Sequence, residues 1–187
     1  MNMTGAGKML QNPNFFTSIR IFSVPLIVVL LVLPQSRLVC FMAALVFSVA
    51  SITDYIDGFL ARKHGMVSNF GKAMDPLADK LLVCCSFIML AARGLVPGWI
   101  VCVIVARELG ITGMRNVLAD AGQDISASML GKYKTTFQIA AIIPLLLHYE
   151  YFGINMHVAG TWLLWCAVAL TLWSGIDYMI KVKPFLS

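Results

Sequence analysis

Long apolar segments recur along the whole of this 187-residue chain, and they restrict its fold more than any other feature. Hydrophobic residues make up 59% of the sequence and charged residues only 12%. A helix needs about 20 apolar residues to cross the hydrocarbon core of a bilayer. Six segments approach that length, over residues 17–34, 38–61, 73–93, 96–118, 133–151 and 157–180. We therefore predict one all-α domain over 1–187, an integral membrane protein with six transmembrane helices and a polar N-terminal surface segment over 1–16.

The basic residues divide unevenly between the two ends of these spans. Twelve lysines and arginines lie on one side, and only Arg37 and Arg93 lie on the other. Because cytosolic flanks carry the excess of positive charge, both termini are expected in the cytosol, with the chain in the cytoplasmic (inner) membrane. The net charge of +5 comes from scattered residues. This pattern favours contact with anionic membrane lipids over nucleic acid.

Five cysteines lie inside the apolar segments, at Cys40, Cys84, Cys85, Cys102 and Cys166. Their spacing is not that of a metal site. A free cysteine packs like a small hydrophobic residue. We therefore expect all five to be buried.

Four of the nine acidic residues gather at the end of the second span and the start of the third, at Asp54, Asp57, Asp75 and Asp79. At 100° per residue, the members of each pair lie on one helix face. A short connection would place the two faces side by side. Carboxylates within a membrane cost a few kcal/mol each, on the order of the insertion scales, unless they are compensated. Because hard cations take oxygen ligands, the set predicts a site for one or two divalent metal ions and substrate phosphates.

Small residues and one cation share the same helix faces, at Gly58, Ala61, Arg62 and Gly71. Glycine and alanine let a ligand come close to the backbone, and the guanidinium group can neutralise phosphate. For single residues, other interpretations stay open. Asp75 followed by Pro76 fits a helix N-cap with proline at the first helical position. Asp54 or Asp57 can pair with a neighbouring basic residue.

The spacing D-x2-D-G-x2-A-R-x8-G-x3-D-x3-D matches the signature of the CDP-alcohol phosphatidyltransferase family without a departure. The matching residues are Asp54, Asp57, Gly58, Ala61, Arg62, Gly71, Asp75 and Asp79. The similarity continues outside the signature. Segments 13–20, 107–115, 131–138 and 170–174 resemble the bacterial branch that makes phosphatidylglycerophosphate. The resemblance thus covers essentially the whole chain.

This resemblance implies a six-helix membrane enzyme, usually a homodimer, with a site that opens to the cytosol. Such enzymes move a phosphatidyl group from a CDP-linked lipid to an alcohol and release CMP. The resemblance implies two Mg²⁺ or Mn²⁺ ions, the first bound by Asp54, Asp57 and Asp75 and the second surrounded by Asp54, Asp75 and Asp79. It also implies that Asp79 is the general base on the acceptor hydroxyl. The implied nucleotide contacts are Asp54, Gly58, Ala61, Arg62 and Gly71.

The candidates for binding an acceptor phosphate are the basic residues Arg107, Arg115, Lys132 and Lys134. Glu108 and Arg115 share a helical face and can pair. Lys134 and Gln138 also share a face. Cations that point inward would form an anion pocket, which favours an acceptor with its own phosphate, such as sn-glycerol 3-phosphate. The resemblance implies CDP-diacylglycerol as the donor. The alternative is that these side chains snorkel to lipid headgroups.

Thr17 and Arg20 begin the first span on the same side of the membrane. They fit phosphate binding and a helix start with a snorkelling arginine equally well.

Two alternative functions stay open. The same chemistry could serve another acceptor, such as phosphatidylglycerol in cardiolipin synthases, or inositol phosphate, inositol or serine in related enzymes. A divalent-cation transporter is the alternative from another class, and it would need polar residues through the full depth of the membrane. The outer halves of the spans are almost wholly apolar, so the sequence favours the enzyme.

Overall fold

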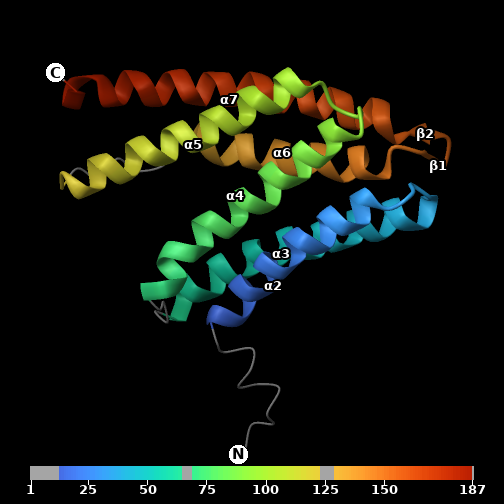
Figure 1. Ribbon diagram of the computed structural model, residues 1–187. Coiled ribbons are helices and arrows are strands. Elements are labelled where there is room, and N and C mark those ends of the chain that lie inside the picture. The colour runs from blue at the N-terminus through green and yellow to red at the C-terminus, as the bar shows by residue number, and fades with distance from the viewer. Residues whose placement is uncertain (1–12, 65–68, 123–128, 187) are drawn as a thin grey trace, which may run out of the picture. The chain divides into compact units, whose positions relative to one another are not determined.

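The computed structural model describes the backbone of residues 13–64, 69–122 and 129–186, and the side chains of 21–53, 77–122, 129–183 and 185 (Figure 1). The described chain forms the helices α2 (Pro13–Val32), α3 (Arg37–His64), α4 (Asn69–Ala92), α5 (Gly98–Asp120), α6 (Met129–Leu147) and α7 (Met156–Leu186). A hairpin of β1 (Glu150–Tyr151) and β2 (Ile154–Asn155) separates the last two helices. Each helix overlaps one predicted span, which confirms a helical chain.

Within the described residues, one helical segment is long and apolar enough to cross a membrane, Met156–Lys183 of α7. Two shorter apolar segments lie in α2 and α3, over Ile21–Val32 and Arg37–Thr53. The positions of the predicted spans are therefore reproduced as helices. The number of spans and the cytosolic placement of the termini stay predictions.

Two predicted boundaries differ from the structure. The fifth span was expected to end at residue 151, but α6 ends at Leu147. His148 has a φ of +30°, which a right-handed helix does not allow. At the hairpin turn Phe152 and Gly153 also have positive φ, as in a type I′ turn. The first span was expected from residue 17, but α2 begins at Pro13, a residue type favoured at the first helical position. The surface location of 1–16 stays a prediction, and residues 1–12 lie outside the described chain.

The chain divides into two compact units, Met1–Met89 and Leu90–Ser187. In the first unit α2 packs against α3. Ile27 and Leu31 of α2 are almost fully buried, and so is Phe47 of α3. These residues give each helix an inward apolar stripe, which is the usual basis of helix pairing.

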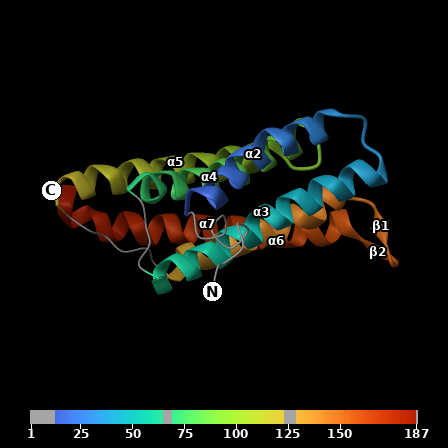
Figure 2. The ribbon, with the colours of Figure 1, turned by 90° about the horizontal axis from the view of Figure 1, so that it is seen from below.

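In the second unit α6 and α7 run antiparallel on either side of the hairpin, and α5 packs along α7 (Figure 2). Helices α6 and α7 approach each other closely at Gly160 of α7. A Cβ added there would lie 2.7 Å from Cγ of Leu145 and 2.9 Å from its backbone nitrogen. Helices in membranes associate through such small residues, which allow the backbones to approach.

The outer surface of the described helices is largely apolar. Fully or mostly exposed side chains include Phe22, Val32, Leu38, Leu109, Trp162, Trp173 and Ile180. Exposed large apolar side chains in this number suit lipid rather than water. It also explains an error about the cysteines: Cys40 and Cys84 are buried and Cys85 is half-buried, but Cys102 and Cys166 are exposed. An apolar residue of a membrane helix can face outward, so hydrophobicity alone does not decide burial.

We expect Gly160→Ala to destabilise the protein by about 1–3 kcal/mol, the usual range for an overpacked contact. In an open helical position the same change is stabilising, because alanine is the better helix former. Gly113→Ala in α5 is the matched control, since no atom lies within 4 Å of its added Cβ. Thermal unfolding in detergent measures both variants. Equal shifts for the two would contradict the close approach.

Candidate functional site

The four aspartates lie on two consecutive helices. Asp54 and Asp57 belong to the second half of α3, and Asp75 and Asp79 belong to the first half of α4. Since α4 already begins at Asn69, Asp75 is not the N-cap of this helix, and that interpretation is wrong. The continuous helical backbone confirms that each pair shares one helix face. A set of four carboxylates on two faces fits a hard divalent cation by the chemistry of its donors.

The structure describes only part of this set at the level of side chains. The side chain of Asp79 is half-buried. The side chains of Thr17, Arg20, Asp54, Asp57, Ala61, Arg62 and Asp75 lie outside the described ones, and Gly58 and Gly71 are placed only as helical backbone. Among the side chains that are described, no group of three or more His, Cys, Asp or Glu is close enough to hold a metal ion.

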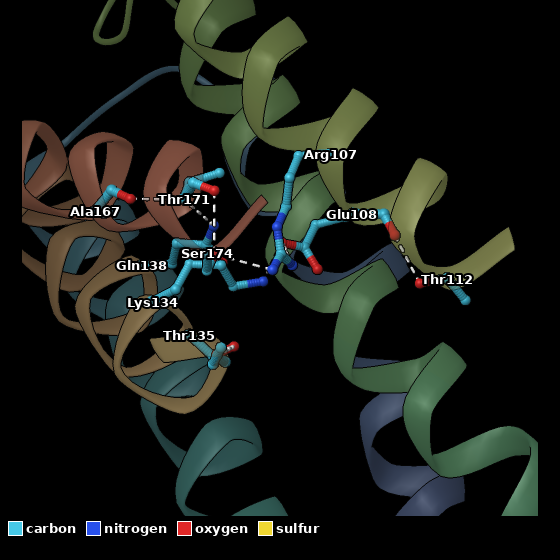
Figure 3. A network of polar contacts seen from close by, with 10 residues as sticks. Arg107, Glu108, Thr112, Lys134, Thr135, Gln138, Ala167, Thr171 and Ser174 are labelled. Atoms are coloured by element: carbon cyan, nitrogen blue, oxygen red, sulfur yellow. Dashed lines mark hydrogen bonds and ion pairs between the residues drawn. The ribbon is translucent and has the colours of Figure 1, made fainter. Parts of the chain in front are cut away.

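A second polar cluster is described in full, in the unit Leu90–Ser187. It brings together side chains from three largely apolar helices (Figure 3). Its members are Arg107 and Glu108 from α5, Lys134 and Gln138 from α6, and Thr171 and Ser174 from α7. All of these except Arg107, which is half-buried, are buried.

An ion triad forms the centre of this cluster. Oε1 of Glu108 accepts a hydrogen bond from Nζ of Lys134, and the same oxygen lies 3.3 Å from Nη1 of Arg107. The side chains of Lys134 and Glu108 are only 4% and 7% exposed. Nη2 of Arg107 donates to Oγ of Ser174 at 2.9 Å. Buried charges persist only when they are paired and hydrogen-bonded, and here both conditions are met.

Two expectations about side-chain partners can now be compared with the structure. Lys134 and Gln138 do share the inward face of α6, and Nε2 of Gln138 donates to Oγ1 of Thr171 at 3.2 Å. The expected pairing of Glu108 with Arg115 is wrong, because the carboxylate binds Lys134 and Arg107 instead. A lysine from another helix reaches Glu108, which spacing within one helix does not reveal.

Arg115 has a different neighbour. Its guanidinium carbon lies 5.9 Å from the centre of the Tyr178 ring, in the geometry of a cation–π contact. Tyr178 packs with Ile111 and Leu118 between α5 and α7. The guanidinium of Arg115 is also close enough to Arg107 for like-charge repulsion. The two arginines therefore concentrate positive charge between α5 and α7.

Three buried donors between α5 and α7 have no hydrogen-bond partner within the described structure. They are Nε of Arg107, Nε of Arg115 and the hydroxyl of Tyr178. An unpaired buried donor costs about 1–3 kcal/mol. Unpaired donors on positively charged groups are what an anionic ligand can satisfy.

The four predicted acceptor cations thus have different environments. Lys134 is buried, Arg107 and Arg115 are half-buried, and Lys132 is exposed. Snorkelling to lipid headgroups is therefore wrong for Lys134 and Arg107, whose charged groups are bound inside the unit.

Two residues of the cluster, Thr171 and Ser174, were not predicted, and neither was Tyr178, the neighbour of Arg115. A usable signal was present, since positions 171, 174 and 178 fall on one face of an apolar helix. Polar groups on a single face of such a helix point to a buried polar contact.

Comparisons with known proteins agree with this picture. The sequence model described as CDP-alcohol phosphatidyltransferase matches residues 10–173. A Bacillus subtilis (strain 168) protein named CDP-diacylglycerol–glycerol-3-phosphate 3-phosphatidyltransferase is 42% identical over 184 residues, 92% of this chain and 95% of that protein. Proteins of the same name from Rickettsia typhi and Escherichia coli (strain K12) are 39% and 35% identical, over 92% and 93% of this chain and 97% and 96% of theirs. With this similarity along nearly its whole length, the chain belongs to the CDP-alcohol phosphatidyltransferase family.

Proposed function

We propose that this protein is an enzyme that transfers the phosphatidyl group of CDP-diacylglycerol to sn-glycerol 3-phosphate, giving phosphatidylglycerophosphate and CMP. The observation that carries the proposal is the similarity over 92–93% of the chain to relatives named for this reaction. The buried cations of α5 and α6 give an independent chemical reason for an acceptor that carries its own phosphate.

The reaction needs no nucleophile from the protein. A hydroxyl oxygen of the acceptor attacks the phosphorus that carries diacylglycerol, and the bond from that phosphorus to the CMP oxygen breaks. CMP leaves with the electron pair, and the carboxylate of Asp79 accepts the hydroxyl proton. A positioned base of this kind contributes about 10²–10⁴-fold to the rate.

The donor side of the site rests on the signature residues. Asp54, Asp57, Asp75 and Asp79 would hold two Mg²⁺ or Mn²⁺ ions, which when bound stabilise negative charge on the donor phosphates. The nucleotide would lie against Asp54, Gly58, Ala61, Arg62 and Gly71. Small residues suit this role because they let a planar or phosphate group approach the helix backbone.

The acceptor side rests on the cationic cluster. Arg107, Arg115 and Lys134 carry the charge that would bind the phosphate of glycerol 3-phosphate, and two of them offer unpaired Nε donors. Lys132 is exposed near the start of α6 and would attract the acceptor from solution. Thr17 and Arg20 of α2 would add contacts to donor or acceptor phosphates.

We further infer that the protein is a multi-pass homodimer of the cytoplasmic (inner) membrane, with its site facing the cytosol and membrane lipids as neighbours. Support for the membrane placement comes from the exposed apolar side chains, from α7, which is long enough to span a bilayer, and from the uneven distribution of basic residues. The homodimer is proposed from the resemblance to the family alone. The cytosolic side is also where soluble glycerol phosphate and a nucleotide-linked lipid headgroup would meet.

Replacement of the proposed base tests the mechanism. We expect Asp79→Asn to lower CMP release from CDP-diacylglycerol, Mg²⁺ and glycerol 3-phosphate by about 10²–10⁴-fold, because the amide cannot accept the hydroxyl proton. Asp177→Asn is the control, since that carboxylate is ion-paired with Lys181 in the C-terminal part of α7. Release by the wild type only with phosphatidylglycerol or an inositol compound would overturn the acceptor. No release with any acceptor from folded, metal-loaded protein would overturn the enzyme.

Loss of one arginine tests the acceptor pocket. Arg115→Gln should raise KM for glycerol 3-phosphate by about tenfold or more while KM for CDP-diacylglycerol stays unchanged, because a hydrogen bond to a charged group contributes about 1.5–3 kcal/mol. Lys181→Gln removes the same charge from an exposed ion pair of α7 and serves as the control. Equal changes in both KM values would contradict a role in acceptor binding.

Thermal protection distinguishes the enzyme from a cation transporter. CMP should raise the unfolding temperature only when Mg²⁺ or Mn²⁺ is present, because the donor phosphates complete the coordination of the metal. Scans with EDTA, with metal alone and with metal plus CMP provide the comparison. Protection by the metal alone, unaffected by CMP, would favour transport.

A further inference from the structure

Lys134 and Arg107, two of the cations proposed to bind the acceptor phosphate, are already partly neutralised by a carboxylate of the same cluster. Oε1 of Glu108 binds both Lys134 and Arg107. Two positive side chains and one negative one leave the triad with a net charge of +1. A phosphate that approaches these cations must therefore overcome a buried carboxylate that occupies the same donors.

A carboxylate is an unexpected partner in a pocket for an anion. It repels phosphate at short range, and removal of its own charge from water is costly. Ser174 and Gln138 show that neutral polar groups are available in the same cluster. The retention of a full negative charge at the centre of the triad calls for a specific role.

The geometry suggests that role. A carboxylate oxygen and a phosphate oxygen are acceptors of the same kind, and both take charge-assisted hydrogen bonds from lysine and arginine. In the structure Glu108 takes the hydrogen bonds that a phosphate oxygen would take. Meanwhile Ser174 holds the other nitrogen of the Arg107 guanidinium at 2.9 Å, so that the cation is already oriented, and its Nε has no partner.

We propose that Glu108 is a positioning residue that determines anion specificity. This inference rests on the proposed function of the cluster as the acceptor-phosphate site. In the empty site the carboxylate stands in for the phosphate and keeps Lys134 and Arg107 charged and oriented. A phosphate monoester, with two charges and three free oxygens, competes with it successfully. A monovalent anion does not, because it offers no more than the carboxylate that it would replace.

Binding of small anions tests the proposal apart from catalysis. Inorganic phosphate and acetate are titrated calorimetrically into purified protein in an uncharged detergent, so that no lipid phosphate competes. Wild type should bind phosphate and not acetate. Glu108→Gln should bind phosphate about tenfold tighter or better, the factor set by one charged hydrogen bond, and should bind acetate as well. Asp177→Asn, which removes an ion-paired carboxylate from α7, should behave as wild type.

A charge-restoring double variant covers the case in which Glu108→Gln does not fold. Lys134→Gln leaves Glu108 with Arg107 alone and no net charge, so phosphate binding should be lost. Glu108→Gln with Lys134→Gln returns the net charge to +1, and phosphate binding should recover toward the wild-type Kd. A carboxylate with only a structural role predicts a double variant no better than Lys134→Gln, and that result would overturn the proposal.

The outcomes separate this inference from the proposed function. CMP release with glycerol 3-phosphate by wild type, together with unchanged or weaker phosphate binding by folded Glu108→Gln, would overturn the role of Glu108 and leave the enzyme intact. CMP release only with another acceptor, together with the expected anion affinities, would overturn the proposed acceptor and support the counter-ion role of Glu108.

Discussion

The need to compensate charge inside an apolar bundle governs the described C-terminal unit. Glu108, Lys134 and Arg107 carry three charges among helices whose exteriors are apolar. Each charge alone would cost several kcal/mol, on the order of the membrane-insertion scales. Together they hold α5 to α6, and the hydrogen bond from Arg107 to Ser174 extends the connection to α7. The relative placement of these three helices therefore depends on ionic contacts as well as on packing.

Packing between α6 and α7 is subject to a second constraint of the apolar environment. Lipid offers no hydrophobic gain when two helices meet, so close contact and interhelical hydrogen bonds must hold them together. Gly160 provides the contact, with Leu145 filling the space where a side chain would be. Gln138 and Thr171 provide the interhelical hydrogen bond beside the ion triad. A small residue and a polar pair thus position the helix that carries Lys134.

The two groups of residues proposed to bind phosphate would handle its charge in opposite ways. The aspartates of α3 and α4 are negative and can meet phosphates only through a divalent cation. The arginines and lysine of α5 and α6 are positive and can meet them directly. A reaction between a nucleotide-linked lipid and a phosphorylated alcohol brings three phosphates together. Metal-bound carboxylates and basic side chains would then both be needed to compensate the negative charge. Lysine and arginine side chains that bind phosphate directly suit the acceptor phosphate, which does not react. Carboxylates that bind through a metal ion suit the donor phosphates, whose negative charge changes during the reaction.

The sequence by itself determined the positions of the helices, since apolar segments of spanning length leave few other folds, and it determined the family, since the aspartate signature has a fixed spacing. It also identified Arg107, Arg115, Lys132 and Lys134 as candidates for an inward cationic pocket, with snorkelling to lipid headgroups as the alternative. The tertiary structure alone decided that Glu108 binds Lys134 and not Arg115 and that Thr171 and Ser174 belong to the cluster. It also decided that Cys102 and Cys166 face outward and that His148 ends α6. Helical periodicity relates residues within one helix only. The partner of a buried charge comes from another helix far away in the sequence, so it is known only once the helices are packed.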